Sequence, residues 1–138
     1  MNYLLLGFIG YLLFDRLNNR LQQLTVRFVR FVPDMANLKL RVIVEVFNPL
    51  PVSITVSNFI GVIKNNRGDT LADVFSVEET EVRPGVTNLT LQVSPYLGNL
   101  TGNWFRNLSG TFDGATLIYT VNSGMLSYRS QLPIQLPQ

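Results

Sequence analysis

Apolar and polar residues alternate along most of the chain after residue 24, which is the pattern of half-buried β-strands. The clearest stretch runs from Leu38 to Phe47. Its predicted inward-facing residues are Leu38, Leu40, Val42, Val44 and Val46. Six further stretches are predicted as strands, at residues 25–32, 52–64, 70–77, 87–93, 111–121 and 125–136. Turn residues rich in Asn, Pro and Gly separate them.

About seven short strands with frequent turns predict a mainly β fold, an antiparallel β-sandwich of the immunoglobulin- or fibronectin-like kind, over residues 25–138. Residues 95–108 do not alternate, and we expect a short helix or an irregular crossover there. This crossover contains Trp104, the only tryptophan. Core packing is the default for Trp104, Phe105 and Tyr96, and lining a ligand groove or dipping into lipid is the alternative.

Residues 1–24 have helical rather than alternating spacing, and residues 1–14 carry no charge. A helix that spans a bilayer fully needs about 20 apolar residues, and the uncharged run here is only 14 residues long. This segment either spans the bilayer or inserts in one leaflet. It lacks a basic start and a small-residue cleavage site, so we expect it to be retained. We therefore predict an N-terminal apolar anchor helix followed by an amphipathic stalk. The predicted membrane-anchor residues are Tyr3, Leu4, Leu5, Leu6, Phe8, Ile9, Leu12 and Leu13.

One face of the predicted helix repeats at intervals of three and four residues, as in helices that pack against a neighbour. The predicted partner-contact residues on this stripe are Gly7, Gly10, Phe14, Leu17, Leu21 and Leu24. Its glycines would allow close approach of another helix, although glycine is also common in membrane helices generally. Arg16 and Arg20 follow the apolar run, where anionic lipid headgroups would lie.

The amino-acid composition excludes several kinds of catalytic and metal-binding site. Hydrophobic residues make up 46% of the chain and charged residues 14%, against about a quarter in ordinary soluble domains. Neither cysteine nor histidine is present, which excludes thiolate nucleophiles, serine–histidine–aspartate triads and the usual zinc sites. Glu78, Glu79 and Glu81 lack the loop pattern of a calcium site, so a solvated edge is the simpler interpretation. We expect no enzyme activity, no cofactor and no bound metal.

Short motifs in the domain are similar to those of the late-embryogenesis-abundant type 2 (WHy-like) family. They are Phe47-Asn48-Pro49 with Pro51-Val52, then Gly61, then Glu81-Val82-Arg83-Pro84-Gly85, and finally Leu108-Ser109-Gly110 opening the last hairpin. The likeness covers residues 25–136. It implies a seven-stranded sandwich with one helix, often behind a membrane anchor, without catalytic activity and associated with membranes and desiccation tolerance.

These features lead to one main hypothesis and one rival. The main one is a non-enzymatic, membrane-anchored structural or adaptor protein of a large assembly, in a virion with an internal membrane, as a minor capsid protein, or in a cell envelope. Its partners would be membrane lipid and other subunits or further copies of itself. Nucleic acid is not expected, because the net charge is only +2, and neither is a small-molecule substrate. The rival is a lipid- or small-ligand-binding, stress-protective module.

Overall fold

The computed structural model describes residues 22–76, 78–100 and 102–136. The predicted anchor helix, with Arg16, Arg20 and the stripe as far as Leu21, lies outside the described residues and stays a prediction. From Thr25 onward the chain is mainly β, as the alternating pattern predicts.

Nine strands, one short helix and one 3-10 turn make up the described part of the chain. The strands of the first half are β1 (Thr25–Asp34), β2 (Lys39–Asn48), β3 (Ile54–Val56), β4 (Asn58–Lys64) and β5 (Thr70–Phe75). Those of the second half are β6 (Thr80–Val82), β7 (Gly85–Pro95), β8 (Thr116–Ser123) and β9 (Leu126–Pro133). Between β7 and β8 lie η1 (Leu97–Asn99) and α2 (Leu108–Phe112).

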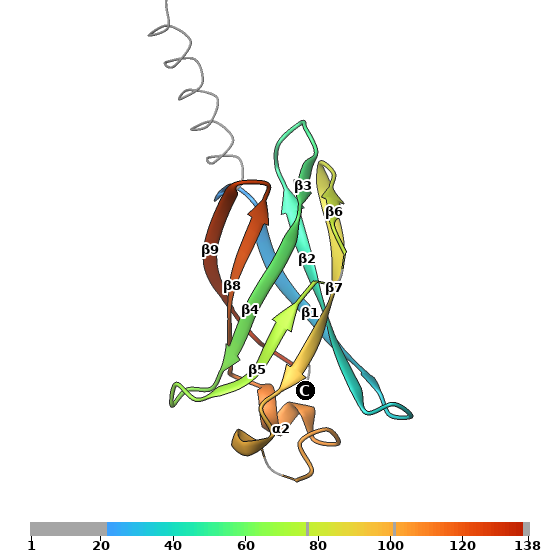
Figure 1. Ribbon diagram of the computed structural model, residues 1–138, viewed down its shortest axis with the longest axis vertical. Helices are drawn as coiled ribbons and strands as arrows, with labels where there is room; N and C mark the ends of the chain where they lie inside the picture. Colours follow the sequence, from blue (N-terminus) through green and yellow to red (C-terminus); the bar gives the residue numbers. More distant parts are fainter. Residues whose placement is uncertain (1–21, 77, 101, 137–138) are drawn as a thin grey trace, which may run out of the picture.

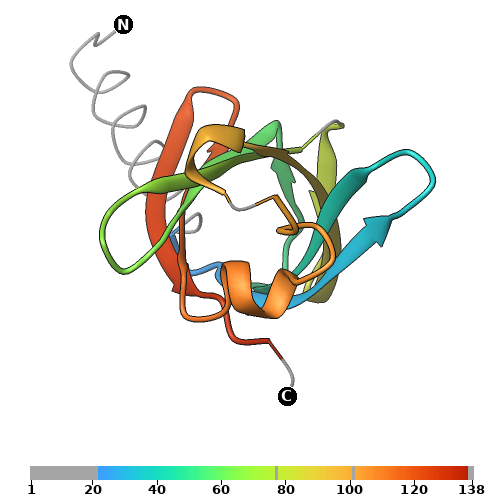
Figure 2. The same ribbon diagram turned by 90° about the horizontal axis from the view of Figure 1, so that it is seen from below.

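Seven strands form one antiparallel sheet in the order β1-β2-β7-β5-β4-β8-β9, while β3 and β6 pair in a small second sheet. The large sheet curls until its two edge strands, β1 and β9, come into contact. Figure 2 shows this sheet as a ring with α2 across one end. The curled antiparallel sheet confirms the predicted fold class in its general form.

The core fills the inside of this curled sheet. Along β2 the residues Leu40, Val42, Val44 and Val46 are all buried, as their alternation predicts. Phe59 of β4 stacks on Tyr119 of β8, with ring centroids 4.9 Å apart. Burial of such side chains, at about 1.5–3 kcal/mol each, is the main force that stabilises the domain.

Several expectations for the strands were wrong. Residues 52–64 form two strands, because the chain leaves β3 at Ser57, whose N–H donates to Asn122 O, and β4 then pairs with β8. The short strand β6 had not been predicted. Leu38 does not begin the inward row of β2 but lies in the preceding turn with 72% of its surface exposed.

Near the final hairpin the predicted strand at residue 111 also begins too early. Thr111 and Phe112 belong to α2, and so do Leu108-Ser109-Gly110, which were expected to open the hairpin. The Asn107 side chain caps this helix by accepting a hydrogen bond from the N–H of Gly110. An asparagine at this position stabilises the first helical turn and so competes with strand formation. The expected crossover at residues 95–108 is therefore confirmed and extends to residue 115.

Candidate functional site

The turn that ends β2 depends on Asn48, the one buried polar side chain among the described residues, with 1% exposure. Its Nδ2 donates to Val52 O at 2.8 Å and to Val82 O at 3.2 Å, and its Oδ1 accepts from the Leu50 N–H at 3.0 Å. The side chain thus joins β2, the proline-rich turn and β6. Because every polar atom is occupied within the domain, Asn48 has a structural role and is no binding site.

The acidic residues of the described part of the chain do not gather into a metal site. Glu78, Glu79 and Glu81 are exposed. No group of three or more acidic residues in residues 22–76, 78–100 and 102–136 is placed to hold a metal ion. Asp73 accepts a hydrogen bond from the Tyr96 hydroxyl, and this bond raises the pKa of Tyr96 above its ordinary value.

Aromatic residues close the end of the curled sheet that lies beyond the last residue of β1. Phe112 of α2 is fully buried, with its ring centroid 5.0 Å from that of Phe31 and 6.4 Å from that of Trp104. Trp104 in turn packs edge-to-face on Phe105 at 5.3 Å. Trp104 and Phe105 are half-buried: each packs against the core with part of its surface and exposes the rest to solvent.

An apolar groove of about 620 Å³ lies at this same end, and we call it the distal groove. Its lining includes Met35, Leu38, Leu97, Trp104, Phe105 and Arg106. Leu38 is 72% exposed, Leu97 68% and Met35 55%. Exposed apolar side chains gathered from separate segments are typical of interaction sites.

Leu38 also has an unusual backbone. Its φ of +51° places it in the left-handed region, the one described non-glycine residue with a positive φ. This conformation costs a leucine about 1–2 kcal/mol, which asparagine or glycine would largely avoid. Because the apolar side chain of Leu38 is exposed, its burial does not offset the cost of the strained backbone in the folded domain. The strain therefore directs attention to binding at the distal groove.

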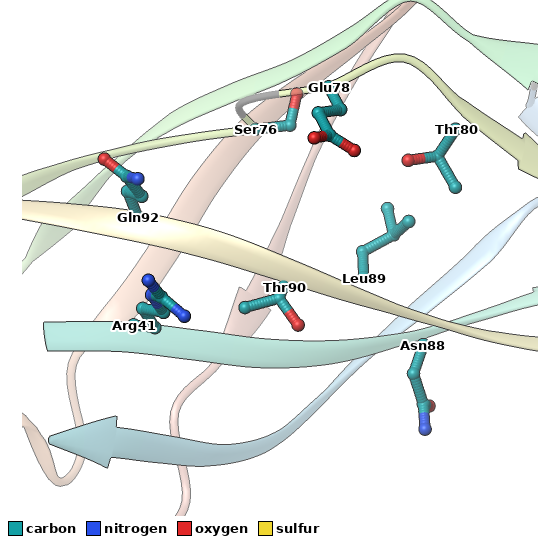
Figure 3. A pocket seen from close by; sticks show the side chains of 8 residues that line it. All are labelled: Arg41, Ser76, Glu78, Thr80, Asn88, Leu89, Thr90 and Gln92. Atoms are coloured by element: carbon teal, nitrogen blue, oxygen red, sulfur yellow. The ribbon is translucent and has the colours of Figure 1, made fainter. Parts of the chain in front are cut away.

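A second hollow, of about 380 Å³, opens beside β7, and we call it the polar hollow. It is lined by Arg41, Ser76, Glu78, Thr80, Asn88, Leu89, Thr90 and Gln92. Figure 3 shows Ser76, Glu78 and Thr80 on the segment that faces β7, with Gln92, Thr90 and Asn88 along β7 itself. Hydroxyl, amide and carboxylate groups dominate this lining, so it suits hydrogen-bonding ligands.

Sequence reasoning named few of these residues. Leu24, the one predicted partner-contact residue that the structure describes, is 6% exposed and packs into the domain's own core. The alternation of β2 placed Leu38 in the core, and nothing in the sequence marked Met35 and Leu97. The aromatic run at residues 104–105 was the one signal that pointed to the distal groove.

Among the described helices, none has the length and apolar content to cross a membrane.

No model of a known protein family matches the sequence, and neither does any curated protein sequence. Among solved structures, a protein from Archaeoglobus fulgidus matches with 17% identity and a TM-score of 0.41, over 83% of this chain and 98% of that one. A FixG-related protein from Vibrio parahaemolyticus matches with 13% identity and a TM-score of 0.36, over 82% and 95%. Likenesses at this level carry no argument about family or function.

Proposed function

We propose that the protein is a non-enzymatic adaptor, held at a membrane or in a large assembly by residues 1–24 and binding a protein subunit through the distal groove. The observation that carries the proposal is the placement of two features at opposite ends of β1. The N-terminal segment joins β1 at Thr25, and the distal groove begins just after Asp34, at Met35. Figure 1 shows β1 running along the length of the domain. A strand of ten residues is about 30 Å long, so the start of β1 and the groove beyond its last residue are about that far apart.

The chemistry of the groove favours a protein partner. Three exposed apolar side chains and two half-buried aromatic ones offer a surface that gains free energy when covered, at about 25 cal/mol per Å². Arg106 adds one positive charge to the lining. A partner loop or helix with a large apolar side chain next to an acidic one would cover the apolar surface and place a carboxylate near Arg106. Aromatic and arginine residues are common among those that dominate protein–protein binding.

The attachment half of the proposal rests on the anchor and headgroup residues of the N-terminal segment. Removing residues 1–14 is expected to release a folded domain from the membrane or assembly fraction. Replacing both Leu17 and Leu21 with asparagine is expected to weaken assembly with little change in the unfolding transition of the domain. If the shortened protein still incorporates into the assembly, the attachment role of the segment is wrong.

The binding half can be tested at Leu38 without harming the fold. Asparagine tolerates the left-handed backbone, so Leu38→Asn removes an apolar contact while relieving strain. A photo-reactive side chain at Met35 of the full-length protein should cross-link to one protein subunit in native membranes or particles, and Leu38→Asn should abolish that product. The same probe at Met125, in the β8–β9 turn at the other end of the domain, is the control. Equal labelling from both positions would contradict a distal protein site.

The second candidate is a lipid- or small-ligand-binding, stress-protective module, which the resemblance to the late-embryogenesis-abundant type 2 family implies. The volume of the distal groove favours it, since 620 Å³ is within the range of about 300–1,000 Å³ for small-molecule sites. The cross-linking experiment separates the two candidates, because a lipid adduct at Met35 would replace the protein adduct.

A further inference from the structure

The outer face of the large sheet carries an apolar patch. A hollow of about 390 Å³ lies there, and we call it the sheet hollow. It spans β5, β4, β8 and β9, neighbouring strands that lie side by side across one face of the domain (Figure 1). Ile60 is 49% exposed and Phe75 36%, with the half-buried Val62 and Ile118 beside them. Apolar side chains gathered on the outside of a sheet are typical of a surface that another molecule covers.

Two charged residues line the sheet hollow, and they lie on opposite sides of the apolar patch. Asp73 is on β5, where it pairs with Val62, and Arg129 is on β9, where it pairs with Thr120. Three strand spacings and one step along the strands separate them, which is about 16 Å between their Cα atoms. They are too far apart to pair with each other. Among the described residues neither forms an ion pair.

The carboxylate of Asp73 has room for a cation. It accepts a hydrogen bond from the Tyr96 hydroxyl at 3.1 Å, and a carboxylate can accept several such bonds. Two other basic residues of the neighbouring strands do not line the hollow: Lys64 is the last residue of β4, and Arg41 is on β2, two strands beyond β5. The hollow thus has one negative and one positive side.

An apolar centre between opposite charges is complementary to a second copy of itself. A two-fold axis midway between Asp73 and Arg129 runs across the apolar patch and places Asp73 of each copy opposite Arg129 of the other. Sheets that pack face to face are about 10 Å apart, a gap that these side chains can bridge. We propose that the protein forms a two-fold homodimer through the sheet hollow, with two Asp73–Arg129 ion pairs beside an apolar centre. This surface is separate from the distal groove and goes beyond the adaptor function proposed above.

The same rotation accounts for the apolar side chains. It brings β5 of each copy over β8 and β9 of the other, so the exposed Phe75 ring enters the second copy's hollow beside Thr120. Ile60 and Ile118 lie nearest the axis, and each faces its equivalent. The apolar contacts supply affinity, whereas the two ion pairs fix the orientation of the copies.

Charge exchange tests the dimer in the full-length protein, by sedimentation equilibrium in a mild detergent. Asp73→Arg and Arg129→Asp should each weaken dimerisation at least tenfold, because each change turns both ion pairs into like-charge contacts. The double variant has the net charge of the wild type and should return to within threefold of its affinity. A mixture of the two single variants should form heterodimers as tight as the wild type, since both pairs then attract again.

The β4–β5 turn supplies the matched control. Arg67→Asp and Asp69→Arg make the same changes of charge at residues that do not line the hollow, and each should alter the affinity less than twofold. Equal weakening by the control variants would show long-range charge rather than a site, and would overturn the proposal.

A cross-link tests the position of the axis. The chain has no cysteine, so an introduced thiol is unique. A short bis-maleimide should link Ile60→Cys into covalent dimers and should leave Asn88→Cys, exposed on β7, monomeric. A monomeric wild type, a dimer that survives both single charge variants, a double variant without recovery, or equal cross-linking from residues 60 and 88 would overturn the proposal.

Discussion

Replacing Asn48 with alanine should be among the most damaging changes of a polar side chain in this domain. Three backbone groups lose their partner: Val52 O, Val82 O and the Leu50 N–H. A buried group left without a hydrogen bond costs about 1–3 kcal/mol. Two of the three bonds are only partly buried, so water can compensate there, whereas the bond to Val82 O is buried. We expect a loss of about 2–4 kcal/mol, a large share of the 5–15 kcal/mol typical of a domain.

Urea unfolding followed by tryptophan fluorescence and circular dichroism measures this loss as a lower midpoint at unchanged slope. The exposed Asn66 offers a control, since Asn66→Ala should stay within about 0.5 kcal/mol of the wild type. A loss below about 1 kcal/mol for Asn48→Ala would refute the view that this side chain holds the turn to β6. Growth of the slope would instead indicate a changed denatured state.

Asn48→Asp separates charge from shape at the same site. The carboxyl group keeps an acceptor for the Leu50 N–H but would face two carbonyl oxygens, Val52 O and Val82 O. Burial and these oxygens disfavour the charged form, so the pKa of the introduced group should rise above the ordinary value of about 3.9. Between the two values the folded state binds more protons than the unfolded one. The variant should therefore lose stability as pH rises from about 4, and a variant with the opposite trend would contradict the buried geometry.

Three other variants test separate parts of the structure. Leu38→Asn should raise the free energy of unfolding by about 1 kcal/mol in urea titrations, and a loss would contradict the left-handed strain. Gly61→Ala should cost about 1–3 kcal/mol, because its Cβ would lie 2.5 Å from Ile118 O, while Gly98→Ala, in open space, should be nearly neutral. Burial raises the pKa of Tyr119, so the wild type should lose stability as pH rises above about 10; Tyr119→Phe should lack that part of the loss in thermal melts across alkaline pH.

Local pattern was enough for most of the strands and for the core of the long strand β2. Alternation at β2 correctly placed Leu40, Val42, Val44 and Val46 inside, because the side-chain period of an extended chain is two whatever surrounds it. The turn at Asn48-Pro49 and the crossover before β8 could also be predicted. Proline, glycine and asparagine restrict or permit particular backbone conformations on their own.

Long-range contacts decided the rest. The break at Ser57 arises because residues on either side of it pair with different strands, β6 and β8, that are distant in sequence. Leu38 was wrongly placed in the strand because its apolar side chain continues the alternating pattern of β2. In the structure the β1–β2 turn includes Leu38, and β2 begins at Lys39.

The two candidate sites also depend on contacts between segments that are distant in sequence. Residues of the distal groove come from the β1–β2 turn and from the crossover about 60 residues later, and no local period can bring them together. The polar hollow exists because β5 stops at Phe75 while β7 continues past it, which is a matter of sheet order. The sequence alone therefore determined most of the strands and the buried face of β2. The tertiary structure decided where β7 extends past β5 and where exposed apolar side chains meet, because both depend on pairing between distant segments.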